Sequence, residues 1–375
     1  MTIGTDSRNV PARERRGAIL LFSGIAAALI ALPAPAFAMH ISEGILPAPW
    51  AILWYALALP FLAWGLRKVR LQSEASSSFK PLVGLVGAAV FIISCMPIPV
   101  PIAGTCSHPA GTGLAAILIG PGLTVVVASI ALALQALFLA HGGITTLGAN
   151  IVSMGVAGAY VGYGAYRIAR HMRLPWAAAA FLAGLLSDWA TYAMTSVELA
   201  SALSGGGSFW AMLSLILLAF VPTQVPLGIL EGILCVGALR FVRNRKPELL
   251  RFAQARGGMK NAALGLIVAG LIVAGPACPL VDAASWSGID ETVIEKVAEE
   301  AGRPAREPFI NTDQGDLLLF VFLVAGIIGG FVAGYNFRVL FPPKRRREED
   351  NAGAPTEVQR VRTLGRGADA PQPKP

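Results

Sequence analysis

Long hydrophobic runs alternate with short polar segments along most of the chain. Eight of these runs approach or exceed the roughly 20 apolar residues that a helix needs to cross the hydrocarbon core of a membrane. They cover about residues 49–66, 81–96, 121–140, 150–169, 175–194, 209–239, 262–281 and 316–341, with a shorter run at 113–120. The pattern predicts an all-α, polytopic membrane helical bundle of about seven spans, followed by a C-terminal unit of two spans.

Basic residues collect in alternate loops, and this sets the expected direction of the spans. Lysine and arginine are concentrated at about 67–80, 167–173, 240–256 and 344–347, and the positive-inside rule assigns such loops to the cytoplasm. The intervening loops hold few bases, and the last of them is rich in acids. We therefore expect a multi-pass protein of the cell (inner) membrane, with the mature N-terminus outside and the C-terminus in the cytoplasm. The loops alternate correctly between the two sides of the membrane only if the shorter run at 113–120 is a crossing or part of one.

Residues 1–38 have the three parts of a secretory signal peptide. A start with four arginines precedes an apolar run of about 15 residues, and Ala36-Phe37-Ala38 matches an A-x-A cleavage site. The run is short for a span and contains prolines near its end, although an uncleaved signal anchor is the alternative. Cleavage after Ala38 makes Met39 the first residue of the mature chain.

After the signal peptide, the sequence predicts two membrane units joined by a linker and followed by a tail. Residues 39–240 form the expected permease bundle, 241–261 a basic cytoplasmic linker, and 262–341 a second unit of two spans around an acidic external loop. The remaining residues, 342–375, have no apolar periodicity and predict a disordered cytoplasmic tail.

Composition narrows the classes of function. Of the 375 residues, 55% are hydrophobic and only 14% are charged, whereas a water-soluble domain carries about a quarter charged residues. This excludes a soluble enzyme and makes membrane lipid the main surroundings. The formal charge of +8 follows the cytoplasmic loops and does not indicate nucleic acid as a partner. The four cysteines lack CxxC spacing, which argues against iron–sulfur or structural zinc sites. No Walker A pattern and no catalytic constellation occur, so the chain itself is not expected to be an enzyme or to hydrolyse ATP.

His40 would be the second residue of the mature chain. A free terminal amine, the amide nitrogen of residue two and the imidazole of that residue can bind one ion in adjoining chelate rings. This planar nitrogen set favours Ni(II), Cu(II) or Co(II) over magnesium, calcium or tetrahedral zinc. His108 lies in an external loop rich in proline and is the natural fourth donor, although a lone loop histidine is also often only solvated.

Four motifs, in order, resemble the CbiM/NikM family, the substrate-binding membrane components of energy-coupling factor (ECF) transporters for cobalt and nickel. They are Met39-His40-Ile41-Ser42-Glu43-Gly44, the run from Cys106 to Gly113, the run from His141 to Asn150, and Thr223 to Leu227 followed by Glu231-Gly232. The resemblance covers about residues 39–240. Residues 262–341 resemble the small two-span CbiN/NikN or PDGLE-type partner, here fused, with Ser287-Gly288-Ile289-Asp290 as a loose match.

The resemblance implies both a function and a ligand set. The family holds its ion with the mature terminal amine, the residue-two amide and imidazole, and the histidine of a Ser-His-Pro loop, which here are Met39, His40 and His108. His141 resembles a family histidine near the site and is assigned, with Ser107, to support around the ligands. The implied protein is a substrate-capture permease that imports Co(II) or Ni(II) and has no covalent cofactor. Its implied partners are separate ECF ATPase subunits and a transmembrane coupling (T) subunit.

Other polar residues lie near the predicted site. Glu43 can orient His40 or neutralise the ion, and Asn150 can cap its span or form a hydrogen bond to the site. Both are therefore candidates for support around the ligands.

Two acids, Asp188 and Glu231, lie well inside predicted helices, where an acid indicates function by default. Gln224 and Glu231 are candidates for contact with the coupling subunit, with helix packing as the other interpretation. Pro222 and Pro226 each remove an amide donor and predict local unwinding of their helix.

Cobalt is slightly favoured over nickel, because Ser-Glu-Gly after Met-His-Ile looks more like the cobalt branch, while the fused C-terminal unit favours nickel. A Ni(II)-specific member of the same system is thus one alternative. The others are an ion-coupled secondary metal transporter with Asp188 or Glu231 as its proton site, and a membrane metal sensor or structural protein.

Overall fold

The computed structural model describes residues 40–73, 78–95, 98–100, 105–205, 207–250, 290–312 and 317–342. The predicted signal peptide, Met39, the predicted span 262–281, and most of the linker and tail lie outside the described residues. The described chain is helical apart from one short hairpin.

The helices follow the predicted hydrophobic runs. Their bounds are α2 (Ala48–Ser73), α3 (Phe79–Ser94), α4 (Thr112–Ile119), α5 (Pro121–Phe138), α6 (Leu147–Asn150), the π-helix η1 (Ile151–Gly158), α7 (Ala159–His171), α8 (Trp176–Leu203), α9 (Phe209–Arg245), the 3-10 turn η2 (Pro247–Leu250), α12 (Asp290–Glu300) and α13 (Leu317–Leu340). The strands β1 (Ile98–Val100) and β2 (Thr105–Ser107) pair antiparallel. Within the described ranges, α2, α5, α9 and most of α13 are long and apolar enough to cross a membrane. The prediction of a polytopic helical membrane protein is confirmed.

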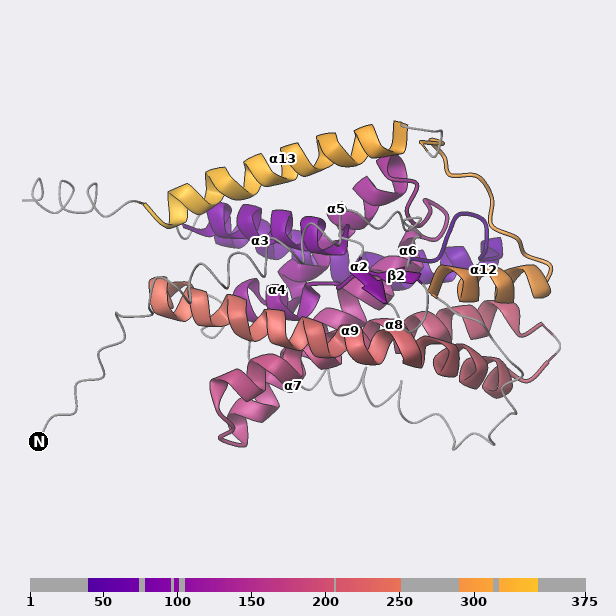
Figure 1. The fold of residues 1–375 in the computed structure, drawn as a ribbon, viewed down its shortest axis with the longest axis horizontal. Helices are drawn as coiled ribbons and strands as arrows, with labels where there is room; N and C mark the ends of the chain where they lie inside the picture. The colour runs from indigo at the N-terminus through magenta and orange to yellow at the C-terminus, as the bar shows by residue number, and fades with distance from the viewer. Residues whose placement is uncertain are drawn as a thin grey trace, which may run out of the picture.

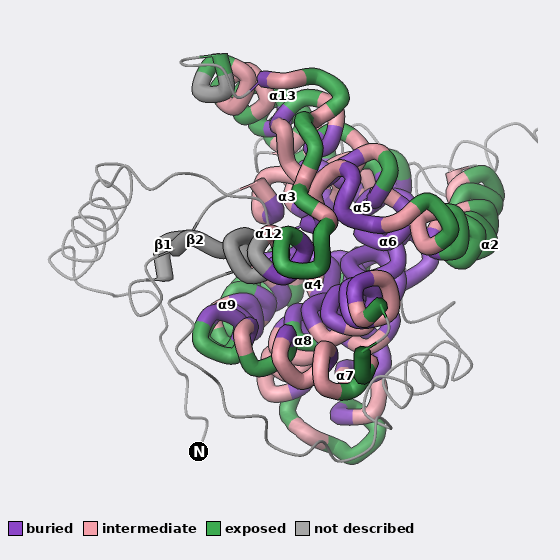
Figure 2. The backbone as a smooth tube through the Cα atoms, turned by 90° about the vertical axis from the view of Figure 1, so that its right-hand side faces the viewer, coloured by how far each residue is buried: buried purple, intermediate pink, exposed green. Residues whose placement is uncertain are grey.

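The bundle is built around the short helix α4. Helix α8 packs along α9, α7 packs along α8, and α4 contacts α5, α7 and α8 (Figure 1). Seven of the eight residues of α4 are buried, whereas α2 has much of its surface exposed (Figure 2). The core of the protein therefore lies where α4, α5, η1, α7 and α8 meet.

Helices α3 and α5 run in the same direction. Gly87 approaches Val127, and seven residues further along α3 the Ser94 hydroxyl accepts a hydrogen bond of 2.7 Å from the amide of Gln135. The chain between the two helices must therefore return across the bundle, and α4, about 12 Å long, covers part of that distance. It passes directly into α5 through Gly120, whose φ of 87° suits glycine. The run 113–120 thus forms a short buried helix between two parallel helices, and its role as part of a crossing stays a prediction.

Two expectations about helix geometry are wrong. Helix α9 is continuous through Pro222 and Pro226, because membrane helices tolerate proline where neighbouring helices pack against them, as α8 does here. Helix α8 continues to Leu203 rather than ending near 194. The extension places Glu198 in a buried helix instead of an external loop.

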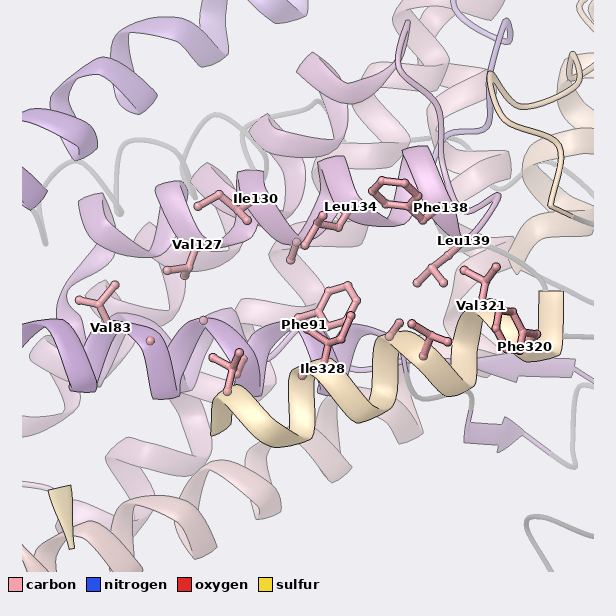
Figure 3. Close-up of a pocket in the computed structure, with 18 residues that line it drawn as sticks. Val83, Phe91, Val127, Ile130, Leu134, Phe138, Leu139, Phe320, Val321 and Ile328 are labelled. Atoms are coloured by element: carbon pink, nitrogen blue, oxygen red, sulfur yellow. The ribbon is translucent and has the colours of Figure 1, made fainter. Parts of the chain in front are cut away.

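The C-terminal part packs on the bundle. Helix α12 contacts α8 and α9, and α13 lies along α3. Gly84 of α3 makes close contact with Asn336 of α13, where a Cβ on the glycine would lie 2.9 Å from the amide nitrogen, and small residues commonly allow such an approach between membrane helices. An apolar groove of about 650 Å³ remains between α3, α5 and α13, lined by side chains such as Phe91, Ile130 and Phe320 (Figure 3).

Candidate metal centre

Three histidines from distant parts of the sequence meet at one end of the bundle. His40 lies in the loop before α2, His108 between β2 and α4, and His141 between α5 and α6. One ring nitrogen of each lies within 4.8 Å of the others, and the ring centroids are 5.0 to 5.1 Å apart. No other group of three such donors comes this close among the residues that the structure describes. His171 lies exposed at the end of α7.

The ring of His40 is oriented by Gln135 of α5. Its Nε2 lies 3.0 Å from the Gln135 side-chain oxygen, while the Gln135 amide donates to Ser94. Since the glutamine presents its oxygen to the histidine, Nε2 of His40 is the protonated donor and Nδ1 carries the lone pair. The nitrogen nearer the backbone is thus the one able to bind a metal.

The loop that carries His40 is fixed to the start of the next helical segment. The Asn150 side chain accepts a hydrogen bond of 2.9 Å from the Ile41 amide and donates one of 3.2 Å to the Ile41 carbonyl. The Thr146 hydroxyl donates to the same carbonyl. The π-helix η1 begins directly after Asn150, and such widened turns are frequent at functional sites. Asn150 therefore holds the backbone beside His40 rather than the histidine ring.

Glu43 binds the loop that follows His141. Its carboxylate accepts hydrogen bonds from the backbone amide and the hydroxyl of Thr145. These bonds tie the loop after His40 to the loop after His141, so Glu43 fixes the spacing of the two loops.

His108 is held from two sides. Its Nε2 lies 2.9 Å from Nε2 of His141, so one ring donates a hydrogen bond to the other. On the other side, Glu231 of α9 accepts hydrogen bonds from the amides of Ala110 and Gly111, at 2.9 and 3.0 Å. Among the further candidates, the side chain of Ser107 lies outside what the structure describes.

Gln224 and Glu231 are 4% and 3% exposed. Neither side chain therefore lies on the surface that a coupling subunit would reach, and the expected direct contact is not supported. Burial beneath the α8–α9 contact is the physical reason.

The three histidines are uncharged at neutral pH. Burial lowers the pKa of His40 to about 3 and the pKa of His108 to about 4, and it holds the pKa of His141 well below its usual range. Repulsion from the neighbouring imidazoles lowers the pKa of His40 and His141 further. Neutral imidazole is the form that binds metals, so the cluster suits a transition-metal ion.

A C-terminal strap, residues 301–312, covers the loop after His40. The amide of Arg306 donates to the Glu43 carbonyl at 2.8 Å, and the guanidinium of Arg303 donates to the carbonyls of Gly44 and Ile45 at 3.1 and 3.4 Å. A polar cavity of about 250 Å³ lies between the strap, this loop and residues 140–142. The C-terminal unit therefore contacts the segment that carries the site.

The sequence interpretation missed two residues that hold the site, Gln135 and Arg303, and one buried acid outside the site, Glu198. Gln135 is a single amide within an apolar run, which is itself a signal for intramembrane function. Glu198 is fully buried, with Ser153 as a polar neighbour, and was expected in a loop. Arg303 is one of three basic residues in a loop rich in acids, and no local sequence pattern distinguishes it from the other two.

The chain is similar to known proteins over most of its length. The model of the CbiM family, described as the cobalt uptake substrate-specific transmembrane region, matches residues 40–249. A cobalt transport protein CbiM of Geobacter sulfurreducens is 54% identical over 329 residues, which cover 85% of this chain and 94% of the relative. Another, of Sorangium cellulosum, is 58% identical over 212 residues, covering 56% and 94%. A crystal structure of a transition metal transporter is 24% identical, with a TM-score of 0.48, and covers 58% of this chain and 99% of that one.

The match to the Geobacter protein extends past the region of the family model. A match to 85% of 375 residues cannot fit within residues 1–249, so it includes part of the C-terminal unit. The family model covers more than half of the chain, and the relatives are named as transport proteins. The chain therefore belongs to the CbiM family and is a multi-pass membrane component of metal uptake.

Proposed function

We propose that this protein captures Co(II), or Ni(II), at the outer face of the cell membrane and holds it in a plane of four nitrogens. The donors are the terminal amine of Met39, the amide nitrogen and Nδ1 of His40, and a ring nitrogen of His108. The observation that carries the proposal is the convergence of His40, His108 and His141 within 4.8 Å, next to the predicted cleavage site.

The position of His40 suits chelation. The amine and the His40 amide nitrogen close a five-membered ring with the ion, and the same amide nitrogen and Nδ1 close a six-membered ring. The bond from Nε2 to Gln135 supports this use of Nδ1. A deprotonated amide also brings one negative charge, which offsets part of the charge of a divalent ion in a buried site. Planar nitrogen donors suit Ni(II) and Co(II).

His141 acts as support for His108 in this proposal. Its Nε2 lies within hydrogen-bond distance of His108, and partners of this kind fix the orientation of a ligand histidine. Ser107 precedes the ligand in the same loop and is assigned to support on the basis of the motif alone.

Import requires energy from other subunits, because the chain has no Walker A pattern. The proposed partners are ATPase subunits of the ECF type and a transmembrane coupling (T) subunit. We expect cells that express this chain with those subunits to accumulate radioactive cobalt, and cells that lack the ATPases to accumulate none. Uptake that persists without ATPases and collapses with an uncoupler would instead indicate an ion-coupled secondary transporter. A parallel assay with nickel identifies the preferred ion.

The C-terminal strap offers a separate prediction. Arg303→Ala removes two hydrogen bonds from the loop after His40, and hydrogen bonds to a charged donor contribute about 1.5–3 kcal/mol each. We expect the dissociation constant for Co(II) to rise about tenfold, equivalent to about 1.4 kcal/mol, as measured by titration of the purified protein. Arg306→Lys is the matched control, because the bond from residue 306 to Glu43 uses the backbone amide and lysine keeps the side-chain carbons that lie against Gly44. Unchanged affinity in Arg303→Ala would contradict a role for the strap in holding the site.

A further inference from the structure

Glu231 of α9 binds the loop that carries His108. One carboxylate oxygen accepts the amide of Ala110 at 2.9 Å, and the other accepts the amide of Gly111 at 3.0 Å. Both amides precede α4, where a carboxylate complements the positive end of the helix. Two bonds from one rigid carboxylate fix both the position and the direction of the loop.

The backbone of Glu231 is itself fixed by α8. A Cβ on Gly184 would lie 2.6 Å from the Glu231 carbonyl oxygen, and a Cβ on Gly232 would lie 2.7 Å from the ring of Phe181. Glycines at these two positions let α8 and α9 approach closely, as small residues do between membrane helices. The carboxylate is therefore held in place by the α8–α9 pair and not by a mobile loop.

The far side of α9 is open. Val225, Ile229 and Ile233 recur at four-residue spacing and are 40%, 43% and 57% exposed. Helix α9 therefore lies between the outside of the described bundle and the loop of His108.

We propose that Glu231 is a positioning residue that couples the position of the His108 loop to the position of α9. A displacement of α9 then moves the His108 loop away from His40 and releases the ion, whereas a fixed α9 keeps the site closed. The inference rests on the proposed function, because only there does His108 bind the metal.

The test is the rate at which Glu231→Gln releases Ni(II), used alone as the probe. The amide keeps the shape of the side chain but places an NH₂ group against one of the two backbone amides, so one hydrogen bond is replaced by a contact between donors. We expect transfer of Ni(II) to a chelator to be about tenfold faster or more, equivalent to about 1.4 kcal/mol. The d–d absorption band of the bound ion should also shift, since the planar set is distorted. The melting temperature of the metal-free protein should fall by only a few degrees, because one buried hydrogen bond is lost.

Glu198→Gln is the matched control. Glu198 is an equally buried acid on α8 whose polar neighbour is Ser153 and not the His108 loop. We expect the release rate and the absorption band of this variant to equal those of the unchanged protein.

Three results separate the possibilities. A Glu231→Gln variant with the release rate and the band of the unchanged protein would overturn the proposal. If that variant does not accumulate in membranes, Glu231→Asp is measured, and failure of both would make Glu231 a folding residue and also overturn it. An unchanged protein that binds no Ni(II) in a planar site would refute the proposed function instead.

Discussion

A chain whose signal peptide cannot be removed should bind cobalt at least about a thousandfold more weakly than the processed chain, a loss of about 4 kcal/mol. Ala38→Leu places a large side chain at the predicted cleavage site, where small residues are required. The nitrogen of Met39 then stays in a peptide bond, so the amine is lost and the ring that it forms with the His40 amide cannot close. N-terminal sequencing and a Co(II) titration of the same membrane-purified sample measure the effect.

Ala34→Leu is the control for that experiment, because it lies outside the A-x-A motif and should leave a mature chain that begins at Met39. Tight cobalt binding by an unprocessed Ala38→Leu chain would contradict the terminal chelate. The three histidines would then be the whole site.

Loss of His108 should weaken cobalt binding far more than loss of His141. We expect His108→Ala, like His40→Ala, to raise the dissociation constant about a thousandfold or more and to abolish uptake, because a ligand is removed. His141→Ala should raise it only about 10- to 100-fold, the usual effect of removing a partner that orients a ligand. Titration of the purified variants and uptake at matched membrane levels give both quantities.

His171→Ala provides a histidine control, since that side chain lies exposed at the end of α7 and should leave binding unchanged. Equal losses for His108→Ala and His141→Ala would contradict the division of roles and make His141 a ligand.

The helical bundle could be predicted because a span must have a minimum apolar length, which the sequence displays directly. The end of α8 could not. The polar residues after 194 resemble a loop in sequence, and only packing against η1 makes a buried helix with Glu198 inside it. The prediction that Pro222 and Pro226 unwind α9 is wrong for a similar reason. Contact with α8 outweighs the tendency of proline to interrupt a helix.

The convergence of the histidines could be anticipated from the motifs, but their supports could not. Gln135 reaches His40 only because α3 and α5 run parallel and bring Ser94 to the same place. Arg303 reaches Ile45 across a sequence separation of 258 residues. Glu231 was expected either in helix packing or in contact with a coupling subunit, and its bonds to Ala110 and Gly111 depend on where α9 crosses α4.

The long reach of Arg303 also sets an order of events during synthesis. Ribosomes make the N-terminal loop first, then the segments with His108 and His141, and only after most of the chain is complete the strap that holds Gly44 and Ile45. A chain interrupted between residues 142 and 300 therefore has all three histidines but lacks the contacts of Arg303 with Gly44 and Ile45. On the proposed function, such a product would bind cobalt about tenfold more weakly than the finished molecule, as expected for Arg303→Ala.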